Sequence, residues 1–256
     1  MLDERLVHSL HVTSGDHGDL PEGAEPHEVF QTSTFAALLD GALEGDVSFS
    51  ELAGHGDLGL GTFDAVDGEM IAVDGEFFRC DAGGIANPVE PDRKTPFACV
   101  VKFEPKHRFE LDGPLDLEGL VAELDRRLGH PEEAHAIRID GRFESVHARS
   151  VPRQSKPYPP MTEVVKAQRV FDIAGVEGTM VGFRFPDYAV SLNVPGYHLH
   201  FITADRSRGG HVLDLTATGV EVAVDDETDI RLELPAGVDL DAAASQEAID
   251  AVEHKG

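Results

Sequence analysis

The segment that most constrains the fold is residues 197–211, with the sequence YHLHFITADRSRGGH. Successive side chains of a β-strand point to opposite faces, so His198 and His200 share one face, and the apolar residues that alternate with them share the other. That apolar face is expected to lie against the core. A polar run rich in turn formers follows at 204–210, and the apolar residues after His211 indicate a second strand. The segment therefore predicts a β-hairpin that returns His211 to the side of the first two histidines.

Three histidines on one face of a hairpin are typical of a metal centre. A lone histidine is more often a hydrogen-bonded residue of the core or the surface. A His-x-His pair with a third histidine across a short turn favours a metal instead, because imidazole nitrogens are common metal ligands. Three protein ligands also leave a coordination position open, as in catalytic rather than structural zinc sites. We therefore predict a metal centre formed by His198, His200 and His211.

The formal net charge of −27 limits the partners that the protein can have. Binding to nucleic acid needs a basic surface that neutralises phosphates, so no binding to nucleic acid or to an anionic membrane is expected. The acidic residues are spread along the chain, which suggests adaptation to high salt, where their mutual repulsion is screened. Loss of structure in low salt would support this halophilic hypothesis, and full stability there would contradict it.

The sequence shows no sign of a membrane span or a secretory signal. It has no apolar run of about 18 residues, and residues 1–20 lack a basic region followed by an apolar one. A cytoplasmic location is therefore expected. In that compartment Cys80 and Cys99 should be reduced, and their spacing is not that of a zinc-binding pair, so we interpret them as buried apolar residues.

The pattern of short strands, turns and few helices predicts an α+β fold. We expect two β-rich halves of mixed or antiparallel sheet with flanking helices, and the metal-binding hairpin in the C-terminal half. A proline-rich segment at 151–161 indicates the boundary between the halves. The expected parts are a flexible acidic arm (1–28), an N-terminal α/β half (29–150), a C-terminal β half with the metal site (151–235), and a C-terminal helix and tail (236–256).

Local patterns predict individual elements within these parts. Asp-Gly pairs between apolar runs indicate turns, because glycine and aspartate tolerate positive φ. The expected elements are a helix within 29–45 capped by Ser33 or Thr34, turns at two copies of VDGE (66–69 and 73–76), an amphipathic helix at 115–128, two strands joined by an Asp-Gly turn within 136–149, and a helix at 240–253.

The histidine hairpin by itself is compatible with more than one kind of protein. Cupins also carry His-x-His on a strand, but their first motif adds a glutamate a few residues later, where this chain has Asp205. Their second motif would have to be HVLD at 211–214, which fits poorly. A cupin-like dioxygenase, which would need iron and oxygen, is therefore one alternative. A non-catalytic metal-binding module is another.

Several longer stretches resemble the α-acetolactate decarboxylase family. They run in the family's order from about residue 30 to residue 215. These stretches are QTSTFAALLDG (31–41), HGDLGLGTFDAVDGEMI (55–71), DGEFF (74–78), TPFA (95–98), RSVPRQSKPY (149–158), VEGTMVGF (176–183) and NVPGYHLHFITADRSRGGHVLD (193–214).

The resemblance implies a reaction, a cofactor and a set of site residues. The reaction is the zinc-dependent decarboxylation of 2-acetolactate to acetoin and CO2, without pyridoxal phosphate or thiamine, in a homodimer. The C-terminal segment is implied to return to the active site. The residues implied are His198, His200 and His211 as zinc ligands, Glu69, Arg149 and Glu253 as catalytic residues with Glu247 as the alternative to Glu253, and Thr62 close to the substrate.

Each of the charged candidates also has an ordinary structural interpretation. Glu69 follows an Asp-Gly turn that recurs before Glu76, and acidic residues are mostly solvent-exposed. Arg149 could form an ion pair between the two halves, and Glu253 could be an exposed residue of a helix. The residues alone leave these alternatives open.

Overall fold

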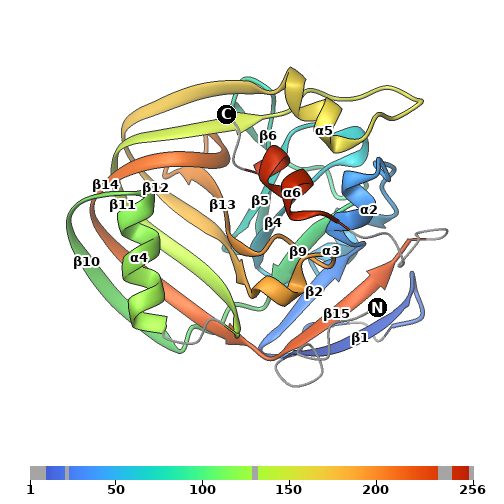
Figure 1. Ribbon diagram of the computed structural model, residues 1–256, viewed down its shortest axis with the longest axis horizontal. Helices are drawn as coiled ribbons and strands as arrows, with labels where there is room; N and C mark the ends of the chain where they lie inside the picture. Colours follow the sequence, from blue (N-terminus) through green and yellow to red (C-terminus); the bar gives the residue numbers. More distant parts are fainter. Residues whose placement is uncertain (1–9, 21–22, 129–131, 236–243, 254–256) are drawn as a thin grey trace.

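Two β-sheets pack against each other in the computed structural model, which describes residues 10–20, 23–128, 132–235 and 244–253 (Figure 1). The first sheet is mixed and consists, in spatial order, of β1 (His11–Asp16), β15 (Asp229–Leu234), β2 (Glu28–Thr32), β9 (Ala98–Val101), β4 (Leu58–Thr62), β5 (Glu69–Val73), β6 (Glu76–Cys80) and β7 (Ala86–Pro88). The second is antiparallel and consists of β10 (His107–Asp116), β14 (Gly209–Glu227), β11 (Ala134–Ser150), β12 (Arg169–Phe185) and β13 (Gly196–Thr203).

The remaining elements are short. Strands β3 (Val47–Ser48) and β8 (Lys94–Thr95) pair with each other. The helices are α2 (Phe35–Leu39), α3 (Phe49–Leu52), α4 (Leu117–Leu128), α5 (Met161–Val164) and α6 (Gln246–Glu253), with single 3₁₀ turns η1 (Asp64–Val66), η2 (Val165–Ala167) and η3 (Asp187–Ala189). None of the helices in the described ranges is long and apolar enough to cross a membrane.

The α+β prediction with two sheet regions is confirmed, and so is the hairpin. Strands β13 and β14 are antiparallel, with His200 opposite His211. Apolar side chains between the sheets form one buried cluster, which joins Ile71 of β5 to Phe183 of β12. A second cluster fills the space between the other face of the second sheet and α4, which covers it on the left in Figure 1.

The sheets do not divide the chain at residue 150. The second sheet takes β10 and β11 from the expected N-terminal half, and the first sheet takes β15 from the expected C-terminal half. Both sheets are therefore assembled from segments distant in sequence. Strand β15 follows β14 directly in the chain but pairs with β1 and β2, so the chain changes sheets between these two strands.

The expected flexible arm at 1–28 contains regular structure where it is described. Residues 11–16 form β1, which pairs in parallel with β15, and Leu10 beside it is buried. The sequence of this strand does not alternate between apolar and polar residues, so it did not predict a strand. The reason is that β1 is an edge strand, and most of its side chains are exposed. Residues 1–9 lie outside the described residues.

Two local predictions need correction. The Asp-Gly pair at 140–141 is not a turn, because β11 continues through it and pairs with β12 on one side and β14 on the other. A Cβ at Gly141 would lie 2.7 Å from the carbonyl oxygen of Gly219, so the glycine serves close strand packing. The helix expected within 29–45 is only α2. It is capped by Thr34, whose hydroxyl accepts from the Ala37 amide, and strand β2 precedes it.

Candidate metal centre and active site

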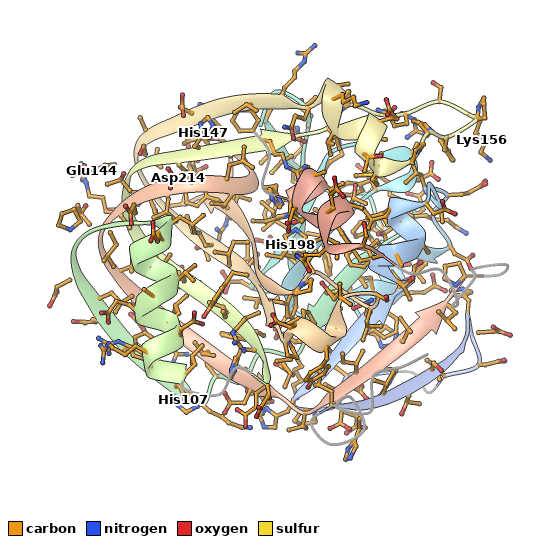
Figure 2. The ribbon with its side chains drawn as sticks, viewed as in Figure 1. His107, Glu144, His147, Lys156, His198 and Asp214 are labelled. Atoms are coloured by element: carbon orange, nitrogen blue, oxygen red, sulfur yellow. The ribbon has the colours of Figure 1, made fainter. Side chains whose placement is uncertain are left out.

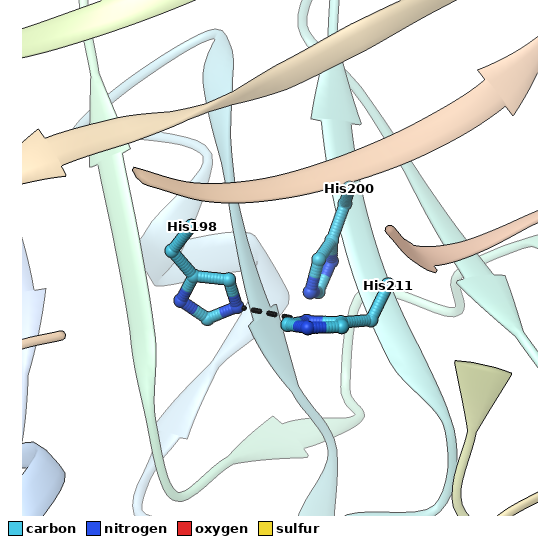
Figure 3. A group of neighbouring side chains, drawn as sticks. All are labelled: His198, His200 and His211. Atoms are coloured by element: carbon cyan, nitrogen blue, oxygen red, sulfur yellow. Dashed lines mark hydrogen bonds between the residues drawn. The ribbon is translucent and has the colours of Figure 1, made fainter. Parts of the chain in front are cut away.

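Strand register brings four of the predicted residues onto one face of the second sheet. His200 of β13 lies opposite His211 of β14, and His211 lies opposite Arg149 of β11. His198 precedes His200 by two residues and therefore shares its face. All three imidazoles converge on one point (Figure 3), and one ligand nitrogen from each lies within 4.8 Å of the others.

The face that carries these histidines is buried, which the sequence did not indicate. The alternating residues Leu199 and Phe201 do pack in the core beneath α4, as expected. The histidine face is covered in turn by the first sheet, so His198, His200 and His211 are all buried as well. Figure 2 shows His198 in the middle of the molecule, between the two sheets. Burial on both faces excludes bulk water from the three imidazoles.

The first sheet supplies Glu69 and Thr62. The two residues lie opposite each other on β5 and β4. Glu69 alternates with Ile71 and Val73, which point into the cluster between the sheets, so its carboxylate also enters that space. Glu69 Oε2 lies 3.6 Å from His200 Nε2. The Thr62 hydroxyl donates to the carbonyl of Gly68 at 2.8 Å, which fixes the side chain at the cavity wall.

Helix α6 supplies Glu253 from the far end of the chain. In Figure 1 this helix lies over the junction of the sheets. Glu253 is buried, and its Oε2 is 3.5 Å from His198 Nε2 and 3.7 Å from His211 Nε2. Glu247 is exposed on the same helix, so the structure brings Glu253 to the histidines and leaves Glu247 outside.

Arg149 lies between the two carboxylates. Its Nη1 is 3.5 Å from Glu69 Oε1, and its Nη2 is 3.9 Å from Glu253 Oε1. These separations exceed a good hydrogen bond, and neither Glu69 Oε1 nor Arg149 Nε has a hydrogen-bond partner among the described residues. Buried polar atoms without partners are costly in a core, and they are typical of a site that awaits a ligand.

Burial sets the protonation of the site. It lowers the pKa of His200 well below its ordinary value, with a further contribution from His198, and it does the same for His211, where Arg149 adds to the effect. Both imidazoles are therefore neutral near pH 7. Burial raises the pKa of Glu69 to about 7, although Arg149 opposes the shift, and the Glu253 carboxylate raises it further. Glu69 can thus both accept and donate a proton near neutral pH.

The residues present fit a metal ion. Neutral imidazoles have lone pairs to offer, and His200 Nε2 has no hydrogen-bond partner among the described residues. His211 Nδ1 and His198 Nε2 are 3.2 Å apart. Two nitrogens bound tetrahedrally to one zinc ion at about 2.0–2.1 Å would be separated by about 3.3–3.4 Å. This pair of histidines thus already has a separation that suits such an ion, and the ligand nitrogen of His200 lies within 4.8 Å of both.

A small cavity of about 30 Å³ lies beside the three histidines. Its polar wall contains all seven residues proposed from the sequence apart from the alternative, Glu247. Its apolar wall is formed by Phe35, Leu38, Val66, Phe97, Val151, Met161 and Val252. The sequence reasoning missed these apolar residues as site residues. Four of them could have been found from the sequence, because Phe35, Val66, Phe97 and Val151 lie within the stretches that carry the family resemblance.

Another group of possible metal ligands lies on the opposite face of the second sheet. Glu133, His135 and Asp226 are close together there, and Asp226 bonds to His135 Nδ1 at 3.1 Å and to the exposed His107 at 3.0 Å. Here both carboxylate oxygens of Asp226 are already bonded to histidines, and Glu133 is exposed. This arrangement is that of a hydrogen-bond network, in contrast to His200 Nε2 in the central site, which has no hydrogen-bond partner among the described residues.

A buried polar network supports the hairpin that carries the three histidines. Asn193, just before β13, donates to Gln31 Oε1 at 2.8 Å, and Gln31 donates to the carbonyl of Leu192 at 2.8 Å. Both side chains are fully or almost fully buried. The network joins β2 to the segment that leads into β13. The QTST (31–34) and NVPG (193–196) stretches therefore hold the two sheets together beside the hairpin.

The comparison with known proteins identifies the family of the chain. A family model described as alpha-acetolactate decarboxylase matches residues 29–245, which include the residues of the cavity wall except Val252 and Glu253. The chain belongs to the alpha-acetolactate decarboxylase family. A family member from Methylococcus capsulatus is 46% identical over 248 residues, covering 94% of this chain and 95% of the relative. One from Methanosarcina mazei is 46% identical over 211 residues, covering 82% of this chain and 73% of the relative.

A solved structure extends the family relation to the fold. The crystal structure of alpha-acetolactate decarboxylase from Bacillus subtilis strain 168 superposes with a TM-score of 0.85 at 39% sequence identity. The superposition covers 89% of this chain and 100% of that one. The two-sheet architecture described above is therefore the fold of this family.

Proposed function

We propose that the protein is a zinc-dependent carboxy-lyase that converts 2-acetolactate to acetoin and CO2. The family and its named members support the reaction. The observation that carries it for this chain is the convergence of Glu69, Arg149 and Glu253 beside three histidines in one buried cavity. A module that only bound metal would have no use for two buried carboxylates and an arginine.

The chemistry demands a site that stabilises negative charge. When a β-keto acid loses CO2, the electron pair of the broken bond moves into the neighbouring ketone, and an enediolate forms. A carbon of this enediolate must then take a proton to give acetoin. A zinc ion held by His198, His200 and His211 would supply Lewis-acid stabilisation to the ketone and hydroxyl oxygens.

Arg149 suits the recognition of the substrate anion. Its guanidinium is planar, permanently charged and able to form two parallel hydrogen bonds to a carboxylate. It is buried, and Nε has no partner among the described residues, so donors remain available to a ligand. We propose that Arg149 orients the substrate carboxylate and then faces the charge that develops when CO2 leaves.

Glu69 and Glu253 suit the two proton transfers. One accepts the proton of the tertiary hydroxyl, and the other delivers a proton to the enediolate carbon. The two carboxylates approach Arg149 through different nitrogens, so they flank the position of a ligand bound there. The pKa of Glu69, about 7, makes it a good proton carrier at neutral pH. Thr62 lies beside Glu69 at the cavity wall and would contact the substrate.

The direct test is acetoin formation from racemic 2-acetolactate by the purified protein loaded with zinc. The assay is run in molar salt, with a chelated sample as the control. Chelator-sensitive acetoin above the spontaneous rate is the expected result. No acetoin from a folded, metal-loaded sample would overturn the proposal and would direct attention to oxygen-dependent chemistry such as that of cupins.

The ligand set has its own test. His200→Ala should abolish tight metal binding and acetoin formation together, because a buried ligand is lost. His107→Ala, in the surface network on the other face, should change neither. Metal content after dialysis and the acetoin assay measure both variants. Tight stoichiometric zinc in His200→Ala would exclude this ligand set.

Three further expectations remain predictions. The homodimer is implied by the family resemblance and is testable by light scattering. The salt adaptation is suggested by the net charge of −27 and is testable by unfolding in low salt. The cytoplasmic location is inferred from the sequence pattern and is testable by cell fractionation.

A further inference from the structure

Two main-chain carbonyls determine which nitrogen of two histidines carries a proton. His200 Nδ1 is 2.8 Å from the carbonyl oxygen of Met70, and His211 Nε2 is 3.2 Å from the carbonyl oxygen of Glu253. A carbonyl can only accept a hydrogen bond, so the nitrogen that faces it must be the donor. The lone pair is then on Nε2 in His200 and on Nδ1 in His211.

These are the nitrogens that a metal would use. His200 Nε2 has no hydrogen-bond partner among the described residues, and His211 Nδ1 faces His198 Nε2 at 3.2 Å, the contact drawn in Figure 3. Metal-binding histidines commonly donate their other N–H to a carbonyl or carboxylate, which fixes the tautomer and the ring orientation. The main-chain carbonyls of Met70 and Glu253 therefore orient His200 and His211 and leave the other nitrogen of each ring available to a metal.

The two supporting carbonyls differ in how firmly they are held. Met70 lies in β5, which pairs with β4 and β6 on its two sides. Glu253 is the last residue of α6, which belongs to neither sheet. This helix is attached by one face, through Ile249 and Val252, which join the apolar cluster that also contains Met161 of α5. The support for His200 is fixed by the sheet, whereas the support for His211 depends on the docking of α6.

Helix α6 also borders the cavity. Val252 and Glu253 form part of the wall of a space of about 30 Å³. Such a space has room for about two water molecules, and 2-acetolactate is several times larger than water. Part of the wall must therefore move before the substrate can enter. Many of the other wall residues lie in strands, whereas α6 belongs to neither sheet and follows them at the end of the described chain, so we take α6 as the element that moves.

We propose that α6 is a docking element that completes the metal centre through the backbone of Glu253. The docked helix fixes the His211 tautomer, so metal binding and helix docking strengthen each other, and undocking opens the cavity. This role is distinct from that of the Glu253 side chain in proton transfer. The coupling needs no assumption about the reaction, whereas the admission of substrate rests on the proposed function.

The first test is zinc affinity, measured by competition with a chromophoric chelator. A chain truncated after Ser245 should bind zinc about 10–100-fold more weakly than the full chain, as is usual when a supporting hydrogen bond to a ligand is lost. Ile249→Ala, which keeps the whole chain but weakens docking, should show a smaller loss. Glu247→Gln, on the exposed face of α6, is the matched control and should show none.

Glu253→Gln separates the backbone from the side chain. It removes the carboxylate charge but keeps the carbonyl, so its loss of zinc affinity should be clearly smaller than that of the truncated chain. Equal losses would assign the whole effect to the carboxylate and overturn the proposal. Unchanged zinc affinity in both the truncated chain and Ile249→Ala would also overturn it. Circular dichroism of each metal-free variant checks that the fold is retained.

The coupling must also act in the reverse direction, because linkage is reciprocal. Zinc should slow amide hydrogen exchange in α6 by the same factor by which docking strengthens zinc binding, and it should have no such effect in His200→Ala. An exchange rate in α6 that does not change when zinc binds would overturn the proposal.

The rate at which zinc is lost to excess chelator reports how often the cavity opens, so this rate should rise in Ile249→Ala. An unchanged rate would mean that undocking of α6 does not open the cavity. None of these measurements uses substrate, so failure of the proposed reaction would leave their outcome intact.

Discussion

The sequence VDGE occurs twice within eleven residues, and the glutamate is buried in one copy and exposed in the other. Residues 66–69 lead from β4 into β5 and end on Glu69, which is buried in the wall of the cavity beside the three histidines. Residues 73–76 form the turn between β5 and β6 and end on Glu76, which is exposed. The same four residues thus give a catalytic candidate in one place and a solvated turn in the other. Local sequence cannot distinguish them, and the neighbours in space can.

The glycines of the two copies show the same contrast. Both have positive φ, which favours glycine. A Cβ at Gly68 would lie 2.3 Å from the carbonyl oxygen of Cys80, whereas at Gly75 the nearest atom would be 3.9 Å away. The first turn is packed against the backbone of β6, and the second projects from the sheet. Burial of Glu69 therefore depends on a turn with no room for a side chain.

The largest expected difference between the copies is catalytic. Glu69→Gln should retain zinc and lose about 10²–10⁴-fold in turnover, the usual contribution of a general acid or base. Glu76→Gln should retain both, since its carboxylate is exposed. Zinc content and the acetoin assay compare the pair. Near-normal turnover in Glu69→Gln would remove this residue from the mechanism.

The glycines should differ in stability. Gly75→Ala should cost about 1–2 kcal/mol, the strain of a left-handed conformation in a residue with a Cβ. Gly68→Ala should cost a further ~1–3 kcal/mol, because the added carbon must displace backbone rather than a flexible side chain. Denaturant unfolding of the two variants measures the difference. Equal costs would mean that the contact with Cys80 relaxes freely.

The pH dependence of stability should also distinguish the copies. Burial raises the pKa of Glu69 to about 7 in the folded protein, so the protonated form is favoured there. The stability that this proton provides is present below the unfolded value near 4.5 and is lost as the pH rises through about 7, which amounts to at most about 3 kcal/mol. In metal-free protein, Glu69→Gln should flatten the fall in unfolding free energy between pH 5 and pH 8. Glu76→Gln should leave that slope unchanged, and identical slopes in both variants would contradict the burial of Glu69.

The aspartates should show the smallest difference. Asp67 accepts from Arg79 at 3.1 Å and from Arg93 at 2.8 Å, with its side chain 23% exposed. Asp74 contacts Arg138 and Arg206 but is 51% exposed. Asp67→Asn should therefore cost about 1 kcal/mol and Asp74→Asn less, because exposed ion pairs are weak. Thermal unfolding in low and high salt measures both, and a larger cost at Asp74 would reverse the ranking.

Several parts of the fold could be read from short-range patterns. The alternation in 197–201 gave the strand and the common face of two histidines, and the turn formers after it gave the hairpin. Thr34 was identifiable as a helix cap, and Asp74-Gly75 as a tight turn. These features depend on backbone geometry within a few residues, which the local sequence specifies.

Other parts were beyond such patterns. The pair at 140–141 has the same Asp-Gly signal as 74–75, yet it lies inside β11, because partner strands on both sides extend the ladder through it. Similarly, the sheets share strands across the expected boundary at 150, since pairing energy does not depend on the order of segments in the chain. The contacts of the histidines with the carbonyls of Met70 and Glu253 cannot be predicted from side chains, because every residue has a main-chain carbonyl.

The sequence by itself determined the donors of this protein: three histidines on one hairpin face, and carboxylates and an arginine in motifs that resemble one family. Only the tertiary structure decided which of them become a site. It covered the histidine face with a second sheet, buried Glu69 rather than Glu76, and brought Glu253 rather than Glu247 to the centre. The physical reason is that ligand lone pairs and shifted pKa values depend on desolvation, and desolvation is a property of packing between segments distant in the chain.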